Sequence, residues 1–189
     1  VQGLIDRLQK ELVEIRGEAY FPSSRFARMN DERSAAGEPV FANPRNAAAG
    51  ALRQLDPSIT AQRPLRFFGY SAVHPDGAGA LPFESQDDLL TTLRDWGVPV
   101  APHRVVCHTL AEVNAWATRV ETEYRSAIDF AIDGAVIKVN ALALQEELGV
   151  VSGRVPRWAI AGKFASDIAE TTLLRIGVNV GRTGSLNPY

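Results

Sequence analysis

The 189-residue sequence has one cysteine, one methionine, three histidines and only three lysines, and it lacks long apolar runs. A lone cysteine, Cys107, excludes an internal disulfide and a zinc site built from several cysteines. No apolar stretch approaches the roughly 20 residues of a transmembrane helix, so no membrane contact is expected. Residues 1–7 have neither the basic start nor the apolar core of a signal peptide. We therefore expect a cytoplasmic protein with no metal site in this chain.

What is present indicates a globular fold. Hydrophobic residues make up 46% of the chain and charged residues 22%, which suits one domain or one domain plus part of another. Strands are predicted over 12–21, 65–73, 135–140, 158–164 and 173–180 from alternating or apolar patterns. A short helix and a polar turn are predicted over 23–38. Further helices are predicted from Asn43 to about Asp56 and after Ser85 and Thr109, and the last two residues each begin a capping-box pattern. Irregular alternation of helices with antiparallel strands predicts the α+β class.

Net positive charge is confined to two stretches of the chain. The net charge is −2, but residues 43–66 hold four arginines against one acidic residue. Residues 151–189 hold five basic residues against two acidic ones, whereas residues 67–150 hold five against twelve. Such separated basic stretches can form a surface for phosphate groups. Scattered solvated arginines would give the same counts, so the pattern alone leaves both interpretations open.

Two of the three lysines lie in apolar predicted strands. Lys138 lies in DGAVIKVN (133–140) and Lys163 in WAIAGKF (158–164), while the third is Lys10. A half-buried ammonium needs an anion, because burying it unpaired costs several kcal/mol. Both lysines therefore suit a phosphate ligand, and pairing with Asp133, Glu18 or Asp129 is the alternative that the spacing leaves equally open.

Two further segments carry candidate polar sites. EIRGE (14–18) puts three charges on one face of a strand, and an acidic side chain held there can accept hydrogen bonds from ribose hydroxyls or hold a lysine. An ion ladder along a strand surface explains the same pattern. At the start of the helix that follows Asn43, Arg45 and Arg53 lie within reach of a phosphate.

Taken together, five strings resemble bacterial NAD-dependent DNA ligase, in order and over nearly the whole chain. The long second string is specific to the NAD-dependent branch, whereas short lysine-strand motifs also occur in ATP-dependent ligases and capping enzymes. The strings are EIRGE (14–18), FANPRNAAAGALRQLDP (41–57), DGAVIKVN (133–140), PRWAIA (156–161) and VGRTG (180–184).

The resemblance implies a nucleotidyltransferase, or adenylation, domain over residues 1–168, with antiparallel sheets and flanking helices. Residues 169–189 would begin an OB-fold domain, being too short to close its five-stranded barrel. The family sequence Lys-x-Asp-Gly, which carries the nucleophilic lysine, is absent from these residues. We therefore expect that lysine upstream, with the adenylation domain incomplete at its N-terminus. The family's zinc site would likewise lie outside this chain.

The resemblance also implies a reaction and its partners. NAD adenylates a lysine, the AMP passes to the 5′-phosphate of a nick in duplex DNA, and the 3′-hydroxyl displaces it with Mg²⁺ assisting, in replication and repair. A monomer is expected. By resemblance, Glu18, Tyr70, Lys138 and Lys163 bind the nucleotide, and Arg45, Arg53, Arg125 and Arg157 contact phosphates of DNA or nicotinamide mononucleotide.

Two departures from the family keep other functions open. Besides the missing nucleophile, Gly162 replaces the aromatic residue that usually precedes the second lysine. A chain without the nucleophile is expected to be inactive alone. The alternatives are a non-enzymatic nucleotide- or DNA-binding module on the same scaffold and an ATP-dependent nucleotidyltransferase.

Overall fold

The computed structural model describes residues 13–74, 81–153, 155–165, 168 and 170–189. The sequence also predicts a turn over 74–79, and all of it except His74 lies outside the described residues. Helices and small antiparallel sheets make up these regions, as the α+β prediction requires. The strand expected over 173–180 is regular only from Val178. The four two-stranded sheets pair β1 (Glu14–Tyr20) with β2 (Arg66–Val73), β3 (Gly134–Lys138) with β6 (Ala159–Lys163), β4 (Val150–Val151) with β5 (Val155–Pro156), and β7 (Val178–Val180) with β8 (Leu186–Pro188).

The β1–β2 ribbon contains one bulge, which lies at Tyr70. Arg16 pairs with Ser71 and Gly17 with Gly69, so Tyr70 is the extra residue on β2. A Cβ on Gly17 would overlap the Phe68 carbonyl oxygen and a ring carbon of Phe67. Only glycine therefore fits opposite this part of β2.

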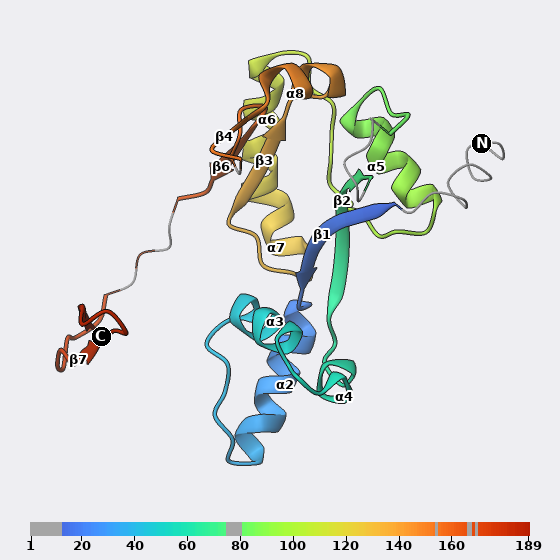
Figure 1. Ribbon diagram of the computed structural model, residues 1–189. Helices are drawn as coiled ribbons and strands as arrows, with labels where there is room; N and C mark the ends of the chain where they lie inside the picture. The colour runs from blue at the N-terminus through green and yellow to red at the C-terminus, as the bar shows by residue number, and fades with distance from the viewer. Residues whose placement is uncertain (1–12, 75–80, 154, 166–167, 169) are drawn as a thin grey trace.

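Three helices gather at one end of the ribbon (Figure 1): α2 (Ser23–Ala35), α3 (Pro44–Leu52) and α4 (Pro57–Ala61). Asn43 begins α3, because its side-chain oxygen accepts a hydrogen bond from Asn46 N at 2.8 Å. Asp56 caps α4 in the same way, through Ser58 N at 2.9 Å. The small face of α3 packs on Phe21, forming a first apolar core of Phe21, Ala47, Ala48 and Ala51.

A second core forms beside the other half of the ribbon, under α5 (Gln86–Asp95). Ser85 Oγ accepts from Asp88 N at 3.1 Å, and Gly97, at φ 84°, follows the C-terminal end of the helix. Leu89 and Leu93 of α5 pack on Ala72 and Phe83 in this core. The predicted helix start at Ser85 is thus confirmed, and so is the one at Thr109, whose Oγ1 accepts from Glu112 N at 3.2 Å. The Glu112 side chain accepts from His108 N at 2.8 Å, and not from Thr109 N as in a complete capping box.

The helix predicted after Thr109 changes its winding before β3. It comprises α6 (Leu110–Arg119), a π-helical turn η1 (Val120–Tyr124) and α7 (Arg125–Ala127). Beyond β3, α8 (Leu142–Leu148) was not predicted, and neither were α4, β4, β5 and β8. Figure 1 shows α6 and α8 grouped with the β3–β6 ribbon. Among the described residues, no helix is long and apolar enough to cross a membrane.

Candidate functional site

Lys138, the last residue of β3, lies with its ammonium against two aromatic rings. Its Nζ is 5.2 Å from the centroid of the Tyr70 ring and 6.0 Å from that of Trp158. The side chain is half-buried, and this burial lowers the pKa of Lys138 below its ordinary value. No carboxylate of the described residues pairs with it. The pairing of Lys138 with Asp133, Glu18 or Asp129, which the sequence left open, is therefore not found among the described residues.

A shallow hollow of about 240 Å³ lies beside this lysine. Arg157, in the turn that leads into β6, adds a second cation to its lining. The rest of the lining is apolar or aromatic, namely the Trp158 ring and residues of the β3–β6 ribbon. The hollow thus offers two positive charges beside an aromatic surface, which is a suitable combination for a nucleotide.

Glu18 and Tyr70 lie on the β1–β2 face opposite to α5. Phe68 pairs with Glu18. Gly69, which lies between Phe68 and Tyr70, turns its Cα hydrogen toward Leu93 and Val98 on the α5 side. Arg16 pairs with Glu14. Glu18 forms no ion pair within the described part of the chain. The same face approaches β3, because the Tyr70 ring reaches Lys138. The Tyr70 ring and the Lys138 ammonium therefore meet between the two ribbons, and Glu18 lies on the β1–β2 ribbon opposite Phe68, two residues before Tyr70.

Lys163 lies on the same face of its ribbon as Lys138 but at the opposite end. Lys163 pairs with Gly134 and Lys138 with Ala159, four residues apart along the strand, which at ~3.3 Å per residue gives about 13 Å between them. Val136 and Ala161, both exposed, lie between them on this face. The two ammonium groups therefore border one open strip rather than meeting at a point.

Asp133 is the partner of Lys163. Lys163 Nζ donates to Asp133 Oδ2 at 2.8 Å, and this contact lowers the pKa of the Asp133 carboxyl, with a smaller contribution from the charge of Arg45. Both side chains are largely exposed, so the pair adds little stability. The pairing alternative raised from the sequence thus describes Lys163 and not Lys138.

Two of the four predicted phosphate-contacting arginines lie close to a lysine or to its neighbour in sequence, and a third acts by its charge on the carboxylate that pairs with Lys163. Arg125 stacks over the Phe164 ring at 5.6 Å, next to Lys163, and Arg45 acts on Asp133 through its charge. Arg157 shares the hollow of Lys138. Arg53 instead follows the last residue of α3, about 12 Å along the helix from Arg45 at 1.5 Å per residue.

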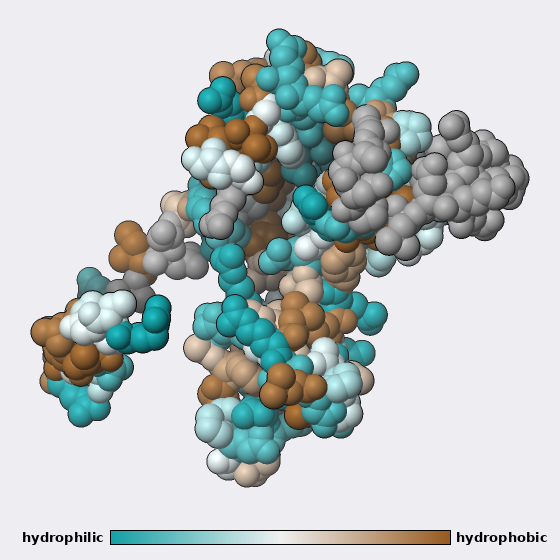
Figure 2. Space-filling view, in the orientation of Figure 1, coloured by the Kyte–Doolittle hydropathy of each residue, from teal (hydrophilic) through white to brown (hydrophobic). Residues whose placement is uncertain are grey.

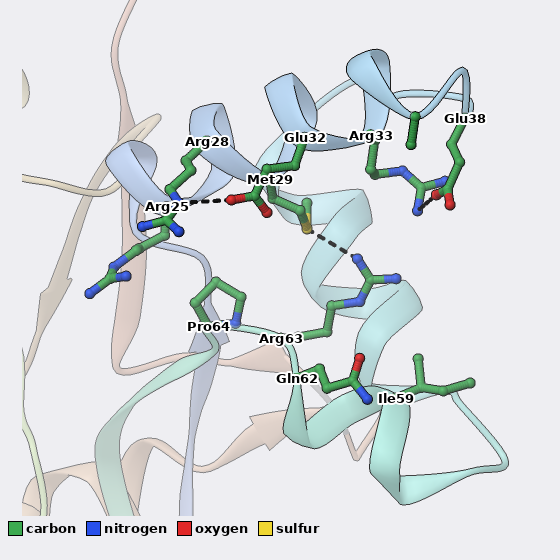
Figure 3. Close-up of a pocket in the computed structure, with 11 residues that line it drawn as sticks. Arg25, Arg28, Met29, Glu32, Arg33, Glu38, Ile59, Gln62, Arg63 and Pro64 are labelled. Carbon is green, nitrogen blue, oxygen red and sulfur yellow. Dashed lines mark hydrogen bonds and ion pairs between the residues drawn. The ribbon is translucent and has the colours of Figure 1, made fainter.

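A second, basic hollow of about 420 Å³ was not singled out from the sequence (Figure 3). It lies between α2 and the segment joining α4 to β2, and four arginines and two glutamates line it. Two arginines pair with the glutamates, but Arg63, half-buried, donates to the weak acceptor Met29 Sδ at 3.1 Å. The available signal was the basic stretch 43–66, which contains Arg63. The charged residues are Arg25, Arg28, Arg33, Arg63, Glu32 and Glu38.

Comparison with known proteins shows the family to which the chain belongs. Residues 4–167 match the family described as NAD-dependent DNA ligase adenylation domain. A DNA ligase of Gemmatimonas aurantiaca is 62% identical over 94% of this chain and 26% of the relative's length. DNA ligases of a Methylobacterium species and of Heliobacterium modesticaldum are 51% and 47% identical, over 94% and 96% of this chain and 21% and 27% of the relatives. The chain spans about a quarter of the length of these curated relatives and belongs to the NAD-dependent DNA ligase adenylation domain family.

Proposed function

We propose that this chain is the adenylate-binding part of an NAD-dependent DNA ligase that seals nicks in duplex DNA. In this proposal, residues up to about 168 belong to a nucleotidyltransferase domain and residues 169–189 begin an OB fold. One observation above all supports it: the half-buried Lys138 ammonium rests on the Tyr70 ring and has no carboxylate partner among the described residues. An adenylate supplies both missing partners, a ring to stack on Tyr70 and an anion for Lys138.

NAD enters as the substrate that supplies the adenylyl group. In the first step a lysine nitrogen bonds to the adenylyl phosphorus, the bond from phosphorus to the bridging oxygen breaks, and nicotinamide mononucleotide leaves with that oxygen. Glu18 would accept hydrogen bonds from the ribose hydroxyls, and Lys138 would neutralise the negative charge on the phosphoryl oxygens. Lys163 can do the same at the other end of the strip once phosphate competes with Asp133 for its ammonium.

In the second step a 5′-phosphate oxygen of the nicked DNA attacks the same phosphorus and releases the lysine. In the third step the 3′-hydroxyl attacks the 5′-phosphorus and AMP leaves. In both steps the lysines of this chain would hold the reacting phosphates, because their ammonium groups are already in position. Magnesium stays an expectation. The described residues hold no group of three or more histidine, cysteine or acidic side chains suited to a metal.

DNA contact is proposed for Arg45, Arg53, Arg125 and Arg157, and for the basic hollow around Arg63. A duplex backbone binds where several arginines face outward, and its affinity falls with salt according to the number of phosphate contacts. Arg63→Ala should therefore weaken binding of nicked duplex and reduce the slope of log affinity against log salt by about 1. Arg94→Ala is the control, because Arg94 is exposed on α5 and pairs with its neighbour Asp95. Equal salt slopes in the two variants would remove the hollow from the interface.

Mass spectrometry tests the proposed reaction directly. The complete protein that contains this chain, incubated with NAD and Mg²⁺, should gain the mass of one AMP, and ATP in place of NAD should give no gain. The 189 residues alone should gain nothing, because they contain no Lys-x-Asp-Gly. A gain with ATP alone would transfer the proposal to the ATP-dependent class. AMP on the isolated chain would refute the assignment of the nucleophile to a residue outside it.

A further inference from the structure

Gln86 and Gln145 are the buried polar side chains of the described residues, with 9% and 8% of their surface exposed. Burying an amide is costly unless it is hydrogen-bonded. Gln145 Nε2 donates to Val139 O at 2.7 Å and to Gln86 Oε1 at 3.3 Å, and Gln86 Nε2 donates to Tyr70 O at 3.0 Å. The two amides thus form a continuous chain of hydrogen bonds between two backbone carbonyls.

The two ends of this chain are the places where the candidate nucleotide site is built. Tyr70 belongs to the β1–β2 ribbon, and Val139 directly follows Lys138 of β3. The two ribbons share no ladder hydrogen bonds. Tyr70 is moreover the extra residue of the bulge, where the ladder is interrupted. Sheet hydrogen bonds therefore do not fix the position of Tyr70 relative to Lys138, and other contacts must do so.

Backbone contacts support the same junction. Gln86 N donates to Asn140 O at 2.7 Å, and Leu142 N donates to Glu84 O at 3.0 Å, so the start of α5 and the start of α8 are joined directly. Asn140 Oδ1 also accepts from Asp87 N at 3.1 Å. The glutamine pair extends this junction inward, toward the Tyr70 ring and the Lys138 ammonium.

We propose that Gln86 and Gln145 are positioning residues that hold the Tyr70 ring and the Lys138 ammonium at the spacing an adenylate requires. The inference rests on the proposed function, since it concerns how that site is assembled. An apolar side chain of similar length would fill the same space but would leave the Tyr70 and Val139 carbonyl oxygens without these hydrogen bonds. The amides therefore add a fixed geometry to what apolar packing already supplies.

The test uses Gln86→Met and Gln145→Met in the complete protein, because methionine is unbranched and close in volume to glutamine. Each variant should lose at least about tenfold in kcat/KM for AMP transfer from NAD, mostly through a higher KM, since a small displacement of binding groups is costly. The double variant should be no worse than the poorer single variant, because both residues act through one chain of bonds.

Leu89→Ala is the matched control, since Leu89 is buried on the same helix and contacts neither glutamine in the bonds described. It should lower the thermal midpoint at least as much as the methionine variants while leaving KM for NAD within about twofold of the parent. Parallel losses of stability and kcat/KM in all variants, or additive kinetic losses in the double variant, would overturn the positioning role. Absence of AMP transfer in the parent protein would instead refute the proposed function.

Discussion

Lys138 stands out at the scale of single residues because its surroundings are suited to a cation but do not neutralise it. The Tyr70 and Trp158 rings attract the ammonium through their faces, yet burial disfavours its charge. A phosphate placed there would remove this penalty and gain a charge-assisted contact. Lys163 differs, since Asp133 already neutralises it in an exposed position.

Removing the Lys138 ammonium should therefore slow AMP transfer strongly. In the complete protein, Lys138→Ala should cost on the order of 3 kcal/mol of transition-state stabilisation, the usual loss for one fixed charge contact. Single-turnover measurement of lysyl-AMP formation from NAD gives the value. Arg94→Ala, on the exposed side of α5, should leave the rate unchanged. Near-parental transfer by Lys138→Ala would exclude the lysine from the mechanism.

The lowered pKa of Lys138 also sets a direction for pH dependence. Because the folded pKa lies below the ordinary 10.5, the unfolded chain binds more protons between the two values, and stability rises with pH in that window. Activity should move the other way, since the proposed role needs the charged form. The profile of kcat/KM for NAD should descend at a pH below 10.5.

Lys138→Arg checks this direction, because arginine keeps its charge throughout the range. The variant should lose the descending limb or move it to higher pH, whatever its absolute rate. An identical alkaline limb in both proteins would assign it to another group.

At the scale of elements, the bulge of the β1–β2 ribbon decides where Tyr70 points, and Gly17 makes the bulge sterically feasible. Gly17→Ala would place a methyl group against the Phe68 carbonyl and the Phe67 ring. We expect a loss of about 1–3 kcal/mol in the free energy of unfolding, typical of overpacking against backbone. Denaturant unfolding measures it.

Gly50→Ala is the opposite control. Gly50 lies inside α3, and nothing would contact an added Cβ within 4 Å. Alanine there should stabilise the protein by about 0.5–1 kcal/mol, through higher helix propensity. Equal effects of the two substitutions would contradict the steric account of the bulge.

The sequence predicted the capped elements better than the uncapped ones. Ser85, Thr109 and Asn43 begin α5, α6 and α3 as expected, because a side-chain acceptor at a helix start acts locally. Helix α8 was missed, since Ala141 at its start offers no such acceptor. The winding change at η1 was also missed. It follows Arg119 without any proline or glycine to mark it.

The candidate site was predictable as a set of residues but not as an arrangement. Composition and resemblance select Lys138 and Lys163 equally. Their different partners follow from register, which puts Lys163 at the end where Asp133 lies. The contact of Tyr70 with Lys138 depends on a bulge and on two buried glutamines, Gln86 and Gln145, from helices that lie far apart in sequence. No local pattern encodes such a contact.

At the scale of the whole molecule, the apolar interior is divided. One core lies around Phe21 and α3, and the other around Leu93 and α5. Outside both, Figure 2 shows apolar residues gathered on the C-terminal hairpin, where Val180 and Leu186 are largely exposed. Leu174, in the segment before this hairpin, is largely exposed as well. On the β3–β6 ribbon, Val136 and Ile160 are exposed as well. Large exposed apolar areas of this kind mark contact surfaces or sites of aggregation.

The isolated 189-residue chain should therefore self-associate as its concentration rises. Two-stranded ribbons leave strand edges open to pairing with another chain, and apolar side chains such as Ile160 and Leu174 favour it. Sedimentation velocity should show larger species at higher concentration, and Ile160→Thr with Leu174→Ser should reduce them. Leu55→Ser, at a fully exposed single site between α3 and α4, should change little. A monodisperse monomer at all concentrations would mean that these faces do not support association.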